Sequence, residues 1–143
     1  MASARLQRYG SSVVIGDLYQ EESVEELDAK VVDASCVSAV KLGQVVLPLP
    51  GFAVQYPQHE IGSLYAELLK KDGIEFEKQG GDEKTAKGTY RHLISKADNM
   101  HLTLDEKDSP SSATTMSMQF DLPAGSYATM LLRELMNTTV ARD

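Results

Sequence analysis

The sequence predicts an α+β fold for this chain of 143 residues. The strongest observation is a helical spacing of apolar residues across 61–69, at positions i, i+3, i+4, i+7 and i+8. These residues are Ile61, Leu64, Tyr65, Leu68 and Leu69. A second observation is the strict alternation of apolar and polar residues over 116–120, which is typical of a half-buried strand. The third is the segment 120–135, which predicts a strand end, a tight Pro/Gly corner and a helix start.

Three short strands are expected before the first strong helix. Val13–Ile15 is an apolar run that ends at Gly16, and Lys30–Val32 is a second short run. Val45–Leu47 is the third, and we expect it to end at Pro48 because proline cannot donate to a strand ladder. The acidic stretch 21–28 fits either a short capped helix or a solvated loop.

The C-terminal part is expected to hold more strands and one helix. The runs 90–94, 100–104 and 116–120 are predicted to pair as an antiparallel meander, with a polar turn over 105–112. Residues 77–88 are rich in Gly and charged residues, which indicates a surface loop between lobes. After the corner, Ser126 can cap a helix running to about residue 137. Its expected buried stripe is Tyr127, Ala128, Leu131, Leu132 and Leu135.

Composition limits the class of protein. Hydrophobic residues make up 42% and charged residues 24%, as in ordinary globular proteins. No apolar run approaches the roughly 20 residues of a membrane span, so no membrane partner is expected. The first residues lack the apolar core of a signal peptide. A single cysteine, Cys36, excludes an internal disulfide and indicates a reducing compartment. We therefore expect an intracellular protein, cytoplasmic or nuclear.

The charge argues against nucleic acid when it is taken alone. The formal net charge is −7 at pH 7, whereas a polyanion normally requires a basic surface. Both parts are acidic, since residues 1–89 carry a net charge of −5 and residues 90–143 carry −2. For nucleic acid to bind, either a local basic patch is hidden by the total charge, or another part of the protein supplies most phosphate contacts.

No pattern in the sequence predicts a metal or cofactor site. The three histidines, His59, His92 and His101, are far apart and have no partners at ligand spacing. Ser126 does not lie in the Gly-x-Ser-x-Gly pattern of a hydrolase elbow. We therefore expect no metal, no organic cofactor and no serine nucleophile.

Three blocks of sequence resemble one protein family. The stretch 120–135, with Leu-Pro-Ala-Gly-Ser-Tyr-Ala-Thr at its centre, resembles the C-terminal signature of the TruD-type pseudouridine synthases. The stretch 47–57, with Leu-Pro-Leu-Pro-Gly-Phe and Tyr-Pro, resembles an upstream signature of their eukaryotic branch. The stretch 88–94, Gly-Thr-Tyr-Arg-His-Leu-Ile, resembles the point where the family's chain re-enters its catalytic domain. The blocks occur in family order and span most of the chain.

The resemblance stops short of the family's catalytic aspartate. That residue lies in a Gly-x-Lys-Asp motif followed by Ala and Thr, and this sequence contains no such motif. The chain therefore resembles the C-terminal part of such an enzyme without its nucleophile. By this resemblance, residues 1–87 would end the insertion domain, and residues 88–143 would be the C-terminal portion of the catalytic domain. Strands and helix there would complete the pseudouridine-synthase catalytic lobe.

The resemblance also implies a chemistry. The family detaches uracil from ribose, turns it and rejoins it through carbon, which requires an extruded nucleotide in a closed pocket. Tyr127 matches an aromatic position at the base pocket; the alternative is a core aromatic. Backbone N–H groups of Gly125 and Ser126 could face the RNA or the catalytic loop, or simply cap the helix.

Three further residues are candidates for contacts with RNA or with the catalytic lobe. Arg133 could pair with Glu134 or Asp121, or reach a carboxylate of the missing lobe. Arg91 and His92 could contact a phosphate, or lie on a solvated strand edge. Phe52 and Tyr56, in the second block, are expected to pack within the lobe rather than touch RNA.

Three functions remain open from the sequence. The first is isomerisation of uridine in tRNA or other RNA, with this chain supplying residues that bind the base and position the RNA. The second is a non-catalytic fragment that binds RNA or protein, and the third is an interaction domain unrelated to RNA. Expected partners are RNA through the full-length enzyme, the missing N-terminal catalytic part, and a second copy of the isolated chain.

Overall fold

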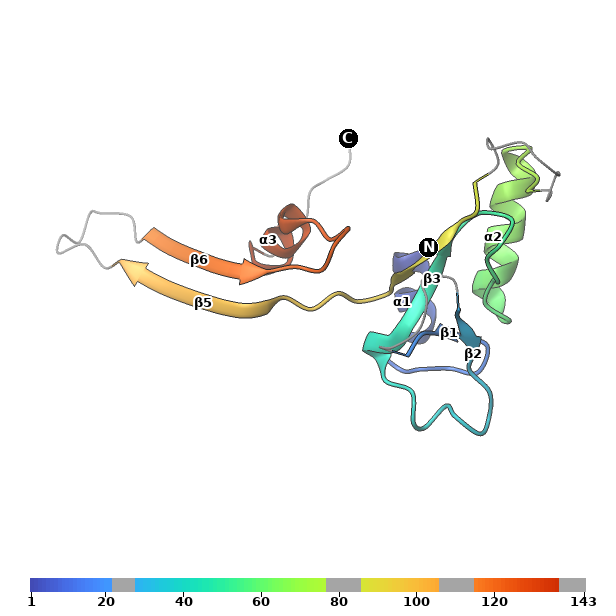
Figure 1. Cartoon of the computed structure of the whole chain (residues 1–143), viewed down its shortest axis with the longest axis horizontal. Coiled ribbons are helices and arrows are strands. Elements are labelled where there is room, and N and C mark those ends of the chain that lie inside the picture. The colour runs from blue at the N-terminus through green and yellow to red at the C-terminus, as the bar shows by residue number, and fades with distance from the viewer. Residues whose placement is uncertain (22–27, 77–85, 106–114, 137–143) are drawn as a thin grey trace. The chain divides into compact units, whose positions relative to one another are not determined.

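The computed structural model describes residues 1–21, 28–76, 86–105 and 115–136, and divides the chain into two compact units. Unit 1 spans Met1–Ile94 and unit 2 spans Ser95–Asp143. Figure 1 labels their helices and strands. The α+β class is confirmed, whereas the assignment of the two parts to an insertion lobe and a catalytic lobe stays a prediction. The expected acidic segment, the loop after the first strong helix and the polar turn fall largely outside the described residues.

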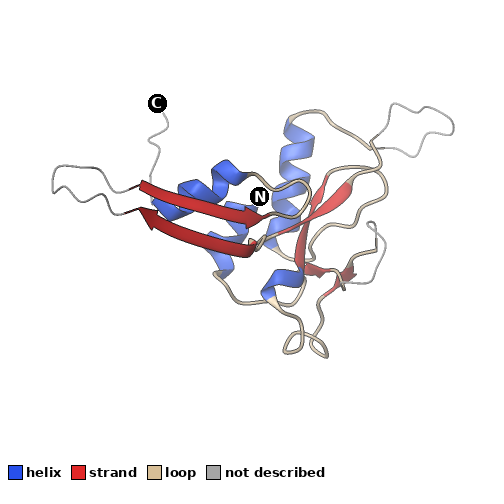
Figure 2. Cartoon of the chain, turned by 60° about the vertical axis from the view of Figure 1, so that its left-hand side comes forward, coloured by secondary structure: helices blue, strands red, loops and turns tan. Residues whose placement is uncertain are grey.

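Unit 1 is built on a four-stranded antiparallel sheet in the order β2-β1-β3-β4. The strands are β1 (Leu18–Tyr19), β2 (Lys30–Val31), β3 (Val45–Leu49) and β4 (Thr89–His92), with a 3-10 helix η1 (Leu42–Gln44) before β3. In Figure 2, β3 and β4 are the longer strands of this sheet, and the two short strands lie beside them. The predicted strand at Lys30 is confirmed. The run 13–15 is not a strand, because the chain turns there before it enters β1.

Strand β3 continues through Pro48, where the sequence predicted an end. The alternation of backbone groups along a strand explains the difference. Leu93 N–H donates to Val45 O at 2.8 Å, so the N–H and C=O groups of Val45 and of every second residue after it point toward β4. Pro48 therefore turns its backbone nitrogen away from β4, on the side where β1 pairs only with Val45 and Val46. The missing N–H leaves no ladder bond unmade at that position.

Two apolar clusters lie on opposite faces of this sheet. One holds Val45, Leu47 and Leu93 together with Ile61 and Tyr65 of helix α2 (Glu60–Lys71). The other holds Leu18, Ala29, Val46 and Tyr90. The alternation of side chains along β3 divides its residues between the two clusters. The predicted helix over 61–69 is confirmed as α2, although only Ile61 and Tyr65 of its apolar face are buried.

Tyr65 provides a direct test of the packing between α2 and β3. Its buried hydroxyl donates to Pro48 O at 2.8 Å, and burial raises the pKa of the phenol, so the group stays protonated. We expect Tyr65→Phe to lower the free energy of unfolding by about 1–2 kcal/mol, because the carbonyl loses its partner. Urea unfolding followed by circular dichroism measures this. Tyr127→Phe, whose ring is exposed in unit 2, should change it by less than about 0.5 kcal/mol.

The predicted three-stranded meander is wrong. Strand β4 pairs with β3 in unit 1, and among the described residues of unit 2 only β5 (Asp98–Asp105) and β6 (Thr115–Asp121) pair. The family block at 88–94 thus joins the block at 47–57 in one sheet, while the block at 120–135 lies in the other unit. Sequence periodicity identifies a strand but not its neighbour, because backbone pairing is indifferent to sequence distance.

Helix α3 (Ala128–Met136) follows β6 as predicted, but its apolar stripe is not buried. Leu131 is half-buried, and the other stripe residues are exposed. Within residues 95–104 and 115–136, none is buried. Unit 2 therefore has the amphipathic pattern of a packed element without a core of its own among its described residues.

Candidate functional site

The corner between β6 and α3 is a tight turn that places Tyr127 at the surface. Ser126 N–H donates to Pro123 O at 3.1 Å, and Gly125 has φ of 80°, a conformation that disfavours a side chain. Tyr127 O then accepts from Met130 N at 3.0 Å, which begins the helix. The Tyr127 side chain is 67% exposed. Of its two alternatives, the core aromatic does not hold in the described structure.

The turn engages the backbone N–H of Ser126, one of the residues that the sequence singled out. Since Ser126 N–H is engaged by Pro123, a contact of Ser126 with a substrate would have to come from its hydroxyl. The side chain is half-buried. The role of Gly125 in binding stays a prediction.

Arg133 lies on α3, exposed, six residues after Tyr127. Six helical residues correspond to about 9 Å of rise. Among the described residues Arg133 forms no ion pair. Asp121, one of its expected partners, instead accepts a hydrogen bond from Asn99 Nδ2 at 2.7 Å.

A bulge lies opposite this corner. The register of β5 shifts between Asp98 and His101, where Asn99 has φ of 49°, and Asp98 pairs with Asp121. Bulges re-aim side chains at the ends of strands. Here the bulge brings the Asn99 amide to the carboxylate that closes β6.

The family blocks at 47–57 and 88–94 meet in unit 1. Phe52 N–H donates to Ala86 O at 3.1 Å and Ala53 N–H to Lys87 O at 2.9 Å. A Cβ added to Gly51 would overlap the backbone at Gly88, so the two chains approach more closely than side chains allow. Tyr56 packs against the ring of Tyr65, with centroids 5.2 Å apart. This agrees with the packing role expected of Tyr56.

Arg91 and His92 are neighbours on β4, and both are exposed. Arg91 pairs with Leu47 and His92 with Val46, so they lie on opposite faces of the sheet. The two side chains therefore cannot contact one phosphate from the same face. They belong to unit 1, whereas Gly125, Ser126, Tyr127 and Arg133 belong to unit 2. Their roles stay predictions.

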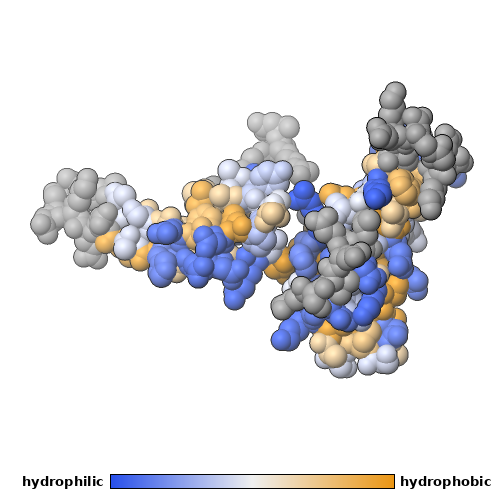
Figure 3. All heavy atoms as spheres, in the orientation of Figure 1, coloured by the Kyte–Doolittle hydropathy of each residue, from blue (hydrophilic) through white to orange (hydrophobic). Residues whose placement is uncertain are grey.

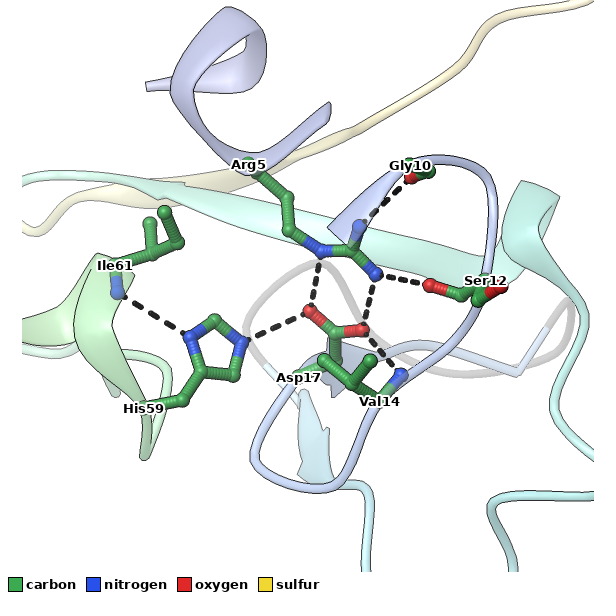
Figure 4. A network of polar contacts seen from close by, with 7 residues as sticks. All are labelled: Arg5, Gly10, Ser12, Val14, Asp17, His59 and Ile61. Carbon is green, nitrogen blue, oxygen red and sulfur yellow. Dashed lines mark hydrogen bonds and ion pairs between the residues drawn. The ribbon is translucent and has the colours of Figure 1, made fainter. Parts of the chain in front are cut away.

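A buried polar network in unit 1 was not predicted from the sequence (Figure 4). Arg5, on helix α1 (Ala2–Tyr9), reaches both carboxylate oxygens of Asp17, with Nε at 2.9 Å and Nη2 at 2.6 Å. Both residues are fully buried. Arg5 also donates to the carbonyl oxygens of Gly10 and Ser12, at 3.0 and 2.6 Å. The guanidinium thereby exchanges its water for four hydrogen bonds to protein acceptors, at least one from each of its nitrogens.

His59 extends the network to α2. Its Nε2 lies 3.0 Å from Asp17 Oδ1, and its Nδ1 accepts from Ile61 N–H at 3.3 Å as the N-cap of the helix. Because Nδ1 accepts, the ring proton lies on Nε2 and is donated to the carboxylate. The network thus ties α1, the turn at Asp17 and the start of α2 together. No periodicity or spacing signals it, because its members are brought together only by folding.

The network predicts a pH dependence of stability. Burial opposes ionisation of Asp17, but hydrogen bonds from Arg5, Val14 N–H and His59 outweigh it and lower the pKa of the carboxyl. The stabilisation is present above the unfolded pKa of about 3.9 and is lost as pH falls through the lower folded value. Urea unfolding between pH 2 and 6 should show this loss. In Asp17→Asn the free energy of unfolding should depend less on pH over this acidic range. Glu60→Gln, which removes an exposed ion pair with Arg8, should keep the pH dependence of the unchanged protein.

Over the described residues, no group of three or more His, Cys, Asp or Glu side chains could hold a metal ion. In that same portion of the chain, no helix is long and apolar enough to cross a membrane.

Comparisons with known proteins agree on one family. The family model described as tRNA pseudouridine synthase D (TruD) matches residues 1–135. The Danio rerio protein Pseudouridylate synthase PUS7L is 35% identical over 98% of this chain and 24% of its own length. The human Pseudouridylate synthase 7 homolog is 29% identical over 95% of this chain and 24% of its own length. The chain therefore spans about a quarter of these curated relatives.

A solved structure gives the same result. The crystal structure of a putative tRNA pseudouridine synthase D from Methanosarcina mazei superposes with a TM-score of 0.68 and 25% identity. The match covers 96% of this chain and 35% of that one. A model match over nearly the whole chain and a relative above 30% identity support one conclusion. The chain belongs to the TruD family of tRNA pseudouridine synthases.

Proposed function

We propose that this chain is the C-terminal part of an RNA pseudouridine synthase, and that it positions the target uridine without supplying the nucleophile. Family membership supports the reaction, the isomerisation of uridine to pseudouridine in tRNA or another RNA. The observation that carries the role of this part is the exposed Tyr127 directly after the tight turn at Gly125. An exposed aromatic ring can stack on an extruded base.

In this proposal neither Asp17, in the buried network, nor Asp121, at the corner before α3, takes the place of the catalytic aspartate of the missing Gly-x-Lys-Asp motif. Asp17 is fully buried, and both of its oxygens are bound by Arg5. Asp121 is held by Asn99 at the bulge. In this proposal the catalytic aspartate comes from the N-terminal part of the enzyme, which is the first partner of this chain, and RNA is the second.

Arg133 has a defined place in the proposal. It lies on the same helix that Tyr127 leads into, exposed and without an ion-pair partner among the described residues. A guanidinium there can bind a phosphate of the RNA or the catalytic carboxylate. Arg91 and His92, in unit 1, would each make a separate phosphate contact, because they lie on opposite faces of β4.

The test is release of tritium from C5 of uridine in labelled tRNA, because joining carbon 5 to the ribose expels that hydrogen. The chain alone should release none. A chimera, in which this chain replaces the matching C-terminal part of the Danio rerio relative, should release it. Release by the chain alone, or none from a folded chimera, would contradict the proposal.

Variants of the chimera test the individual residues. Tyr127→Ala should weaken RNA binding or turnover by about 5- to 150-fold, the range expected for one lost base–aromatic stack. Tyr127→Phe, which keeps the aromatic ring, is the matched control and should leave activity largely unchanged. Arg133→Ala is compared with Glu134→Ala in the same way. Equal effects of Tyr127→Ala and Tyr127→Phe would remove the ring of Tyr127 from the site.

A non-catalytic fragment that binds RNA or protein is the second candidate. The absent Gly-x-Lys-Asp motif and the net charge of −7 favour it for the isolated chain. It predicts binding of an RNA or protein without tritium release even in the folded chimera.

A further inference from the structure

Asn99 has an unusual backbone conformation for a residue in a strand. Its φ of 49° lies in the left-handed region, and no other residue except glycine has a positive φ within 1–21, 28–76, 86–105 and 115–136. Asparagine enters this region more readily than most residues, because its short amide can hydrogen-bond locally. The conformation belongs to the bulge of β5, between Asp98 and His101. It persists only where surrounding contacts hold it.

A pair of like charges lies at this end of the hairpin. Asp98 pairs directly with Asp121, and directly paired residues of antiparallel strands share one face. Two carboxylates in that position repel each other and weaken the pairing of the strands. Both side chains are exposed, so salt screens part of the repulsion. The end of β6 therefore needs a donor that satisfies one of the two carboxylates.

Asn99 supplies that donor. Its Nδ2 donates to Asp121 Oδ2 at 2.7 Å, across the two strands. Regular alternation would turn Asn99 to the face opposite Asp98 and Asp121, and the bulge re-aims its amide toward the carboxylate. A hydrogen bond to an ionised group is about twice as strong as one between neutral groups. The left-handed backbone of Asn99 and its hydrogen bond therefore depend on each other.

Asp121, the residue that Asn99 holds, leads directly into the corner before α3. It is the last residue of β6, and only the five residues 122–126 separate it from Tyr127. No residue within 95–104 and 115–136 is buried, so packing inside unit 2 does not fix this end of the hairpin. In Figure 3 the hydrophobic colour of the hairpin and α3 lies at the surface. The bond from Asn99 can therefore decide the direction in which the chain leaves β6.

Resting on the proposed function, we infer that Asn99 is a positioning residue for the corner that carries Tyr127. By holding Asp121 against the repulsion of Asp98, it sets the direction from which the Tyr127 ring approaches the target base. Asn99 touches neither the base nor the nucleophile in this role. A displacement of about 1 Å in an active site can cost about 100-fold in rate. An exposed contact can therefore matter greatly for turnover while it contributes little to stability.

Two substitutions at Asn99, made in the same chimera, test the amide without disturbing the backbone. Asn99→Asp tolerates the left-handed conformation but replaces the donor with a third carboxylate, and should lower tritium release at saturating tRNA by about 10- to 100-fold. Asn99→Gly also keeps the backbone and removes the amide, and should lower it by about 3- to 10-fold. Thr103→Asp is the matched control, because it adds the same charge to β5 opposite Ser117. An equal loss in Thr103→Asp and Asn99→Asp would overturn the inference.

Coupling to Tyr127 distinguishes positioning from a merely structural role. A residue that acts through the Tyr127 ring has little left to lose once that ring is gone, so the two changes should not be additive. In a Tyr127→Ala chimera, Asn99→Asp should lower turnover by less than about threefold, against at least about tenfold with the tyrosine present. The same fold loss in both backgrounds would mean that Asn99 acts by another route, and would overturn the inference.

Hydrogen exchange of the corner tests the inference without activity. The segment 121–127 contains Ser126 N–H, which the turn binds to Pro123 O. In the chimera, Asn99→Asp should speed exchange of this segment by at least about tenfold, because the corner opens more often, whereas Thr103→Asp should not. Unchanged exchange in Asn99→Asp would overturn the inference. Faster exchange in a chimera that releases no tritium even without these changes would contradict the proposed function and leave the positioning of the corner by Asn99 standing.

Discussion

Replacing Asp17 with alanine is expected to lower the free energy of unfolding by about 3–5 kcal/mol, the cost of leaving one member of a buried ion pair alone. Arg5 would keep its place without water and without a counter-charge, since both residues are fully buried. His59 would also lose the acceptor of its Nε2 proton. Because the total stability of a domain is about 5–15 kcal/mol, unit 1 should lose a large fraction of its stability.

Chemical denaturation followed by circular dichroism measures this loss, and two controls define its cause. Glu60→Gln removes the exposed ion pair with Arg8 and should cost less than about 1 kcal/mol. The double change Arg5→Met with Asp17→Leu removes both charges together, and should recover most of the lost stability. A single Asp17→Ala variant as stable as Glu60→Gln would show that the network does not hold α1 in place.

Replacing Gly51 with alanine is expected to destabilise unit 1 by about 3 kcal/mol or more, at the upper end of the cost of overpacking. The added methyl group would overlap backbone atoms of Lys87 and Gly88, which have no rotamer by which to move aside. Gly88 has φ of 80° and carries its own close contact, since a Cβ there would lie 2.8 Å from Leu49 O. The change should therefore separate the two family blocks where they meet.

Gly43→Ala is the matched control for this prediction. A methyl group at Gly43, in η1, would meet no atom within 4 Å. It should change stability by less than about 1 kcal/mol and can be slightly favourable, because alanine restricts the unfolded chain. Thermal unfolding of both variants gives the comparison. Similar melting temperatures for Gly51→Ala and Gly43→Ala would contradict the close approach of the two blocks.

Local patterns predicted the elements whose reasons are local. Helix α2 was predicted from apolar residues spaced at the helical period. Its C-terminal end was predicted from Gly73, which has a φ of 63° just after the helix. Strand β6 follows from its alternation, and the corner after it from Pro123 and Gly125. In each case the deciding forces act within one turn or one strand, so residues close in sequence are sufficient.

Helix α1 escaped prediction because its most buried residue is charged. Arg5 would normally mark a solvent face, and its burial depends on acceptors that folding supplies, above all the carboxylate of Asp17, twelve positions away. The strand predicted over 13–15 is absent for a related reason, because the backbone there turns toward that network. Val14 N–H donates to Asp17 Oδ2 at 2.9 Å instead of entering a ladder.

By itself, the sequence determined the α+β class, helix α2, the corner at Gly125 and membership of the TruD family. Only the tertiary structure decided that β4 joins β3, that Arg5, Asp17 and His59 share one network, and that the apolar stripe of α3 remains exposed. The physical reason is common to all three. Strand pairing, ion pairing and burial depend on what the folded chain brings together across long separations, and that information is not carried by any single stretch of residues.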